Sequence, residues 1–198
     1  MNTCIIPARG GSRRVPRKNS RLFHGYPIIS YSIVTAIDSQ LFERIVVSTD
    51  DDTIAEIARK HGVDVHKRVP AQAADECGTQ EVAKQVLRDL YPDGNSSNDV
   101  SCVVYATAPM LLTSDLRVGY RALAGHSYAM AVGAEPLRDA GCMYWGYNLA
   151  FVTDQPLIGP YTAMVPLPEH RICDINEISD WHKAEEMYGR LQEGLVDA

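Results

Sequence analysis

Several features that define specialised proteins are absent from this chain of 198 residues. It has only five cysteines, and no two of them form a CxxC pair, so the sequence indicates neither a disulfide framework nor a zinc motif. No apolar run approaches the roughly 20 residues that a membrane span requires. The N-terminus enters an apolar segment without the charged lead-in of a secretory signal. We therefore expect a cytoplasmic protein with reduced cysteines and no membrane contact.

Positive charge is also scarce. The chain has 19 Lys and Arg residues against 25 Asp and Glu residues, which gives a formal charge of −6. A general nucleic-acid-binding protein is usually basic, so we expect no nucleic-acid partner. The hydrophobic fraction of 45% is that of an ordinary globular protein. Because no repeat or linker divides the chain, we expect a single domain over residues 1–198.

Short β-branched runs alternate with segments of helical periodicity. The sequence predicts strands over 3–7, 44–49, 101–105 and 128–132, and a further strand that holds Tyr144. It predicts helices over 28–37, 54–61, 79–90, 114–123 and 181–191. Apolar strands separated by helices are typical of an α/β fold with a mostly parallel sheet, here a three-layer, Rossmann-like α/β/α arrangement. In such folds, ligands bind beyond the C-terminal ends of the strands.

The loop after the first predicted strand concentrates the positive charge. Six of the 19 basic residues lie between Arg9 and Arg21. Gly10 and Gly11 allow a close approach to an anion, and their N–H groups can form an anion nest. Arginine and lysine side chains add donors for phosphate oxygens. This pattern therefore favours a triphosphate-binding site. The alternative interpretation is an ordinary basic loop that is exposed to solvent.

The run from Ile5 to Asn19 (IIPARGGSRRVPRKN) closely resembles the signature of the acylneuraminate cytidylyltransferases, which activate sialic acids and related nine-carbon sugar acids as CMP conjugates. Further stretches that are similar to this family lie at 47–51, 68–79, 105–109, 139–146 and 174–181. Those at 105–109 and 139–146 look most like the branch that activates pseudaminic acid. The resemblance implies a nucleotidyltransferase fold, a homodimer, and Mg²⁺-dependent transfer of CMP from CTP to pseudaminic acid, with sialic or legionaminic acid as alternatives.

The resemblance also implies roles for individual residues. The implied catalytic residues are Arg9, Arg13 and Lys18. The residues implied to bind CTP are Ala8, Gly10, Gly11, Ser12, Asn19, Arg68, Cys77 and Thr79. Tyr105, Thr107 and Tyr144 are implied to contact the sugar, and Asp174 and Asn176 to hold the metal. The residue types of Arg68, Cys77 and Thr79 fit a purely structural loop role as well.

Three positions depart from the family pattern. Arg13 stands where the family has a lysine, and Asn176 replaces the second aspartate of an Asp-Ile-Asp motif. Only residues 134–138 separate the strand ending near Gly133 from Asp139, where the family has a much longer segment that holds the sugar carboxylate and reaches the partner subunit. These departures keep open a second function, that of a relative that binds CTP without transferring CMP.

A third possibility is an NAD-dependent oxidoreductase on a similar scaffold. The loop lacks the GxGxxG fingerprint that such an enzyme carries after its first strand. The sequence therefore disfavours this class. Nucleic-acid binding through the arginine-rich loop is disfavoured further by the acidic total charge.

Overall fold

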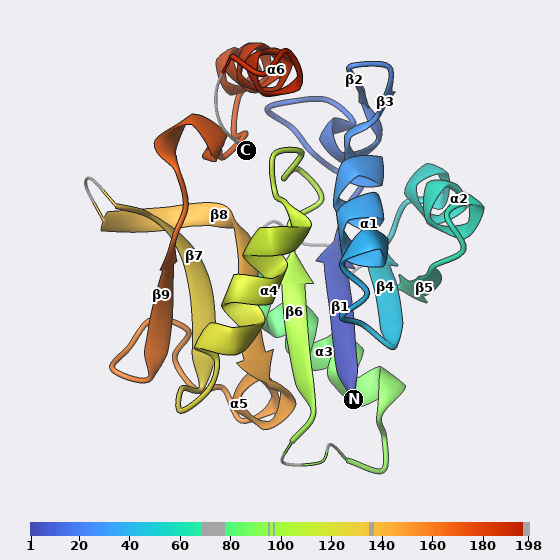
Figure 1. Cartoon of the computed structure of the whole chain (residues 1–198). Helices are drawn as coiled ribbons and strands as arrows, with labels where there is room; N and C mark the ends of the chain where they lie inside the picture. The colour runs from blue at the N-terminus through green and yellow to red at the C-terminus, as the bar shows by residue number, and fades with distance from the viewer. Residues whose placement is uncertain (69–77, 95, 97, 135–136, 196–198) are drawn as a thin grey trace.

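The computed structural model describes residues 1–68, 78–94, 96, 98–134 and 137–195. A seven-stranded sheet has the strand order β5-β4-β1-β6-β8-β7-β9 (Figure 1). Its strands are β1 (Asn2–Pro7), β4 (Arg44–Thr49), β5 (Asp64–Lys67), β6 (Val100–Val104), β7 (Tyr128–Ala134), β8 (Leu137–Tyr147) and β9 (Thr162–Pro166). The short strands β2 (Leu22–Phe23) and β3 (Tyr26–Pro27) form a separate hairpin.

The sheet is mixed but mostly parallel. β1 pairs in parallel with both β4 and β6, and the pairs β4–β5 and β7–β9 are parallel as well. β8 is antiparallel to both of its neighbours, β6 and β7. The β7–β8 pairing extends to Ala134 and Leu137, so these two strands follow each other directly. The predicted sheet type is therefore confirmed.

Helices cover both faces of the sheet. They are α1 (Ile28–Ser39), α2 (Asp52–Lys60), α3 (Thr79–Leu90), α4 (Thr113–Ala122), α5 (Asn148–Val152) and α6 (Ile178–Gln192), with the 3₁₀ turns η1 (Lys18–Ser20) and η3 (Glu169–Arg171). Cys4 of β1 packs in one core cluster with Ile33 of α1, whereas Ile5 packs in another with Val86 of α3. Successive residues of β1 are thus buried on opposite faces, which explains its continuous apolar run. Figure 1 shows α1 and α4 in front of the sheet and α3 behind it, which confirms the three-layer prediction.

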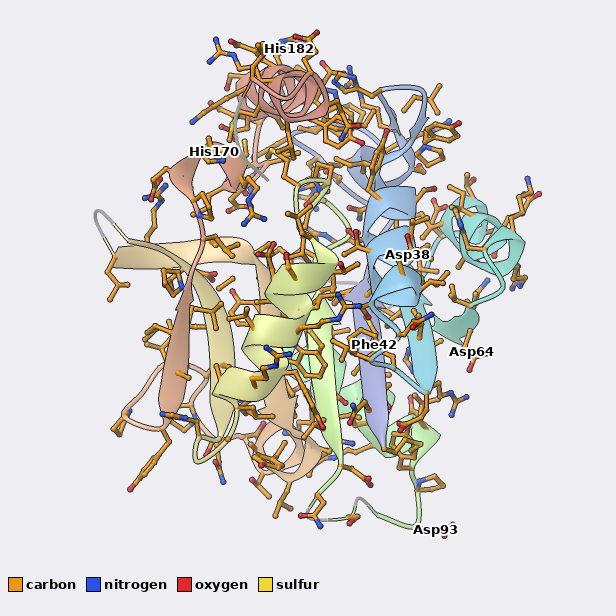
Figure 2. The ribbon with its side chains drawn as sticks, viewed as in Figure 1. Asp38, Phe42, Asp64, Asp93, His170 and His182 are labelled. Atoms are coloured by element: carbon orange, nitrogen blue, oxygen red, sulfur yellow. The ribbon has the colours of Figure 1, made fainter. Side chains whose placement is uncertain are left out.

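α6 lies beyond the C-terminal ends of the parallel strands. Its Trp181 packs in a third core cluster with Val15 and Phe23, and the Arg21 guanidinium lies 5.0 Å from the centre of the Trp181 ring. In Figure 2, His182 of α6 and Asp93 of the loop after α3 mark opposite ends of the sheet. This packing holds α6 against the basic loop after β1. No helix in the described part of the chain is long and apolar enough to cross a membrane.

Candidate active site

A cavity of about 450 Å³ opens at the C-terminal ends of β1 and β6. Its lining comes from the basic loop, the end of β5, the start of α3, the residues after β6 and the segment before α6. The lining residues are Pro7, Arg9, Ser12, Arg13, Arg14, Lys18, Asn19, Arg68, Thr79, Val82, Tyr105, Ala106, Thr107 and Asn176. Five of these side chains are basic, and none of the described lining residues is acidic. The cavity therefore suits a polyanion.

The structure brings most of the sequence-predicted site residues to this one cavity. Those that line it are Arg9, Ser12, Arg13, Lys18, Asn19, Arg68, Thr79, Tyr105, Thr107 and Asn176. Ala8, Gly10, Gly11, Tyr144 and Asp174 are not among its lining residues. Cys77 lies outside the described residues. Arg14 lines the cavity although the sequence interpretation gave it no role, and its place in the same charged run is the signal that could have found it.

Gly10 lies where the basic loop passes the start of α2. Its N–H donates to Oδ1 of Asp50 at 2.9 Å, so the N–H that the sequence assigned to an anion nest is bonded to a carboxylate here. A Cβ on Gly10 would lie 2.6 Å from Oδ2 of Asp51, a distance that only glycine avoids. Asp51 itself caps α2 by accepting the N–H of Ile54 at 2.9 Å. The acidic run after β4 thus fixes the start of the basic loop.

Asn19 holds the same loop from its other end. Its side chain is buried, and Nδ2 donates to the backbone oxygen of Arg9 at 2.9 Å. Arg17, the residue before η1, has a φ of 53°, so the chain turns sharply through the left-handed region at this point. Asn19 therefore positions Arg9 by closing the loop.

Lys18 connects the loop to the segment before α6. Its Nζ donates to the backbone oxygen of Ile175 at 2.5 Å. Burial lowers the pKa of Lys18, and the nearby Asp174 carboxylate opposes this shift while Arg14 and Arg9 add to it. The ammonium group is thus held among like charges, where an anion would relieve the repulsion. Lys18 is thus a partly buried cation at the cavity wall.

Asp174, next to Ile175 in the same segment, is exposed. Gly141 of β8 has a φ of +61°, and a Cβ there would lie 3.2 Å from Cγ of Asp174. Asn176 donates from Nδ2 to Oδ2 of Asp174 at 2.7 Å, and its Oδ1 accepts from Nη2 of Arg14 at 3.1 Å. In this arrangement the Asn176 amide bridges a carboxylate and a guanidinium.

The donor set around Asp174 fits one class of metal site. Among the described residues, no three or more His, Cys, Asp or Glu side chains are grouped to hold a metal ion. A site made wholly of protein ligands is therefore not supported in this part of the chain. Mg²⁺ is commonly held by one or two carboxylates, with waters and substrate phosphates filling the other positions. Asp174 fits that role as a single anionic ligand.

Tyr105 lines the cavity, and Tyr144 lies behind it as a hydrogen-bonding partner. The Tyr105 hydroxyl lies 3.0 Å from Oγ1 of Thr79 and 3.3 Å from the hydroxyl of Tyr144. Tyr144 donates in turn to Oδ2 of Asp139. Burial raises the pKa of both tyrosines, that of Tyr144 far above its usual range. Both are therefore neutral hydrogen-bonding groups, and Asp139 is a partner that the sequence interpretation gave no role of its own.

Arg68 follows β5 and is 7% exposed. Its backbone N–H donates to the oxygen of Thr49 at 2.9 Å, which continues the parallel pairing of β4 and β5. Its Nε donates to Oγ of Ser48 at 3.0 Å. The side chain is thus anchored inside the sheet while it lines the cavity.

Comparisons with known proteins agree with this geometry. A family model described as "Cytidylyltransferase" matches residues 3–188. The chain is 29% identical to the pseudaminic acid cytidylyltransferase of Campylobacter jejuni, over 94% of this chain and 96% of that protein. That alignment spans 222 positions, more than the 198 residues of this chain, so the relative has residues without a counterpart here.

Two further similarities bear on ligand and fold. The chain is 51% identical to the CMP-N,N'-diacetyllegionaminic acid synthase of Legionella pneumophila, but only over 31% of this chain and 26% of that protein. The fold is similar to that of CMP:2-keto-3-deoxy-manno-octonic acid synthetase complexed with CTP, with a TM-score of 0.73. That structural match covers 96% of this chain and 98% of the other at 13% identity, so it supports the fold alone.

Proposed function

The chain belongs to the cytidylyltransferase family, and from that premise we propose that it transfers CMP from CTP to the anomeric hydroxyl of a nine-carbon sugar acid, with release of pyrophosphate. The observation that carries this proposal is the cavity lined by five basic side chains and by Asn176, two residues after Asp174. CTP supplies the polyanion that such a wall requires. The proposal includes a homodimer, as the sequence resemblance implies, and the cytoplasmic location expected from the composition.

In the proposed reaction, the sugar hydroxyl attacks the α-phosphorus of CTP in line. The new O–P bond forms while the bond to the bridging oxygen breaks, and pyrophosphate leaves with the electron pair. Catalysis of such transfers depends on positioning and charge neutralisation. Arg9, Arg13 and Lys18 bind the phosphates and stabilise the charge of the leaving pyrophosphate. Mg²⁺ held at Asp174 would add positive charge on the phosphate oxygens.

The remaining cavity residues bind the two organic parts of the substrates. We assign Arg68 and Thr79 to the cytidine, because they lie together at the ends of β5 and the start of α3. We assign the neutral hydroxyls of Tyr105 and Tyr144, with Thr107, to the sugar. Pseudaminic acid is the proposed substrate because the relative that acts on it matches 94% of the chain. Legionaminic acid is the alternative, since the legionaminic relative is more similar over a shorter segment.

A second function is favoured by one observation. Because residue 176 is asparagine, the site has one carboxylate fewer than an Asp-Ile-Asp motif would supply. The Asn176 amide donates to Asp174 instead. A protein that binds CTP through the basic loop but does not transfer CMP would fit this arrangement. The two functions differ in whether pyrophosphate is released.

The test is pyrophosphate release from CTP and Mg²⁺, with pseudaminic, legionaminic and N-acetylneuraminic acid offered separately. We expect release with pseudaminic acid and its loss on chelation of the metal. Arg9→Ala should lower turnover by about a hundredfold, as loss of a charge-stabilising donor does elsewhere. Asp174→Asn should remove the dependence on Mg²⁺ along with turnover. Lys60→Ala, which removes an exposed cation on α2, is the matched control.

Each outcome separates the alternatives. CTP binding by equilibrium titration without release from any of the three sugars would favour the binding-only function. Failure to bind CTP at all would refute both. Undiminished turnover in Arg9→Ala would reject the phosphate role of the basic loop.

A further inference from the structure

A hydrogen-bonded chain runs from the cavity to the back of α3. Ser48 of β4 and His66 of β5 are direct partners in the parallel pairing of the two strands. Nδ1 of His66 lies 3.0 Å from Oγ of Ser48, and Nε2 lies 2.9 Å from Oδ2 of Asp89 on α3. Since Arg68 donates to the same Ser48 oxygen at 3.0 Å, four side chains form one continuous line, which we name the Arg68–Asp89 relay.

The two ends of the relay fix the direction of every hydrogen bond when the imidazole is neutral. A guanidinium can only donate, and a carboxylate can only accept. His66 must therefore carry its proton on Nε2 for Asp89 and leave Nδ1 as an acceptor. Ser48 then donates its O–H to Nδ1 and accepts from Nε of Arg68. Each of the three bonds then has one donor and one acceptor, so no member of the relay can rotate without breaking the line.

Burial makes these bonds hard to replace. Ser48 is 0% exposed, Arg68 is 7% exposed, and the His66 side chain is 9% exposed. Water therefore has little access to the inner bonds, and a polar group left there without a partner is costly. Asp89, at 47% exposure, is the end that faces solvent, and its hydrogen bond from His66 lowers the pKa of the carboxyl group. The acceptor at the outer end is thus ionised at neutral pH.

The relay contains serine, histidine and aspartate, but it is not a nucleophilic triad. The Ser48 oxygen is wholly buried and accepts from Arg68, so no substrate can reach it. What the line does reach is the cavity wall, through Arg68. α3 also begins at that wall with Thr79, so the relay ties both nucleotide-side elements together.

We propose that Ser48, His66 and Asp89 are positioning residues that fix the guanidinium of Arg68 for the nucleotide. This inference rests on the proposed function, because it takes CTP as the ligand. Nε donates to Ser48 and Arg68 lines the cavity, so this bond sets the orientation of the rest of the guanidinium, including its two terminal nitrogens, at the cavity wall. Their plane is set by the direction in which Nε is held. The relay therefore acts on nucleotide affinity and leaves the transfer step itself unchanged.

Two substitutions of His66 separate this role from a merely structural one. His66→Asn places an amide oxygen near the position of Nδ1, so it keeps the acceptor for Ser48 and loses Asp89. His66→Gln places an amide nitrogen near the position of Nε2, so it keeps the bridge to α3 and loses Ser48. We expect the CTP dissociation constant of His66→Asn to stay within about threefold of the parent. That of His66→Gln should rise about tenfold, because the buried Ser48 hydroxyl loses its acceptor.

If the histidine only joined β5 to α3, the CTP dissociation constant would rise more in His66→Asn than in His66→Gln. The measurement is equilibrium titration with CTP and Mg²⁺, alongside KM and kcat for CTP in the pyrophosphate assay and thermal unfolding of each variant. We expect the loss to appear in the dissociation constant and KM, with kcat within about twofold of the parent, because the reacting phosphate contacts are untouched. Ser48→Ala should behave like His66→Gln.

Controls keep the test decisive. Lys67→Gln alters the next residue of β5, which is exposed and paired with Asp52, and should leave CTP binding unchanged. Asp89→Asn changes only the exposed end, so it folds even if a buried variant does not, and should weaken binding by about threefold. If the parent and the variants bind CTP equally well, the positioning role of the relay is rejected and the proposed function stands. Parent protein that fails to bind CTP would overturn the proposed function and the relay with it.

Discussion

At the scale of single residues, Lys18 is held by opposing influences. Burial lowers its pKa, while the Asp174 carboxylate acts in the other direction and the Ile175 carbonyl fixes its ammonium group. Its charge is therefore lost at a lower pH than that of an exposed lysine. Because the charged form is the one that attracts phosphate, the alkaline limit of CTP binding reports on this residue.

We predict that CTP affinity falls by about tenfold as the pH rises from neutral through the lowered pKa of Lys18, a loss typical of one charge-assisted hydrogen bond. The midpoint of the fall should lie below the ordinary lysine value of 10.5. Lys18→Arg should bind CTP without this fall, since a guanidinium stays charged throughout the range. Titrations of both proteins over this pH range check it, and identical profiles would assign the charge loss to another group.

The sequence predicted which residues meet at the cavity better than it predicted their bonds. The motif after β1 placed Arg9, Lys18 and Asn19 correctly at one wall. It could not show that Gly10 donates to Asp50, because that bond joins residues 40 positions apart and exists only once β1 and β4 are paired. The same holds for the relay, in which β-strand register brings Ser48 and His66 together.

At the scale of elements, the start of α6 is built around Asp180. Its Oδ2 accepts the backbone N–H groups of Asn176 and Glu177, each at 2.9 Å. These bonds lower the pKa of the Asp180 carboxyl group. The capping arrangement therefore holds the backbone of the Asp174–Asn176 segment as well as the first turn of the helix.

We predict that Asp180→Ala lowers the free energy of unfolding by about 1 kcal/mol, the usual value of a lost N-terminal cap. The folded pKa of Asp180 is depressed, so this contribution is present above the ordinary value of 3.8 and is lost as the pH falls through the lowered one. Asp180→Asn keeps an acceptor and should lose less stability at neutral pH. Urea unfolding at neutral pH and below 3.8 checks the sign, and an unchanged gap between parent and Asp180→Ala would contradict it.

Several elements were missed for a physical reason. β5, whose residues are Asp64-Val65-His66-Lys67, and β9, which ends at Pro166, are the two edge strands of the sheet. Edge strands carry charged residues and proline, so they lack the apolar signature of central strands. The interior strands β1, β4, β6 and β7 all had that signature and were predicted to within about two residues, the ordinary uncertainty of element ends.

At the scale of the whole molecule, a buried ion pair joins distant parts of the chain. Arg171 of η3 donates to both carboxylate oxygens of Asp115 on α4, at 2.6 and 3.1 Å, and the two side chains are 5% and 8% exposed. η3 immediately precedes the segment that carries Asp174. The pair therefore fixes that segment to the helical layer in front of the sheet.

We predict that Asp115→Asn lowers the free energy of unfolding by about 3–5 kcal/mol, because it leaves the Arg171 charge buried without its counter-ion. The double variant Asp115→Leu with Arg171→Met should recover most of this loss, since neither charge then remains. Arg190→Gln, which breaks an exposed pair with Glu186 on α6, is the control and should change stability by less than 1 kcal/mol. Denaturant unfolding of the four proteins decides the matter, and a double variant no more stable than Asp115→Asn would contradict it.

The interior place of β1 also means that this strand is synthesised before either of its partners. Both partners of β1 come later in the chain, β4 at Arg44–Thr49 and β6 at Val100–Val104. At 5 to 20 residues per second, translation takes roughly 5 to 20 seconds to pass from the start of β1 at Asn2 to the end of β6 at Val104. During that time the nascent chain carries an apolar strand with an open edge, the kind of segment that associates with other chains. Those seconds are the period in which a chaperone at the tunnel exit has a strand to bind.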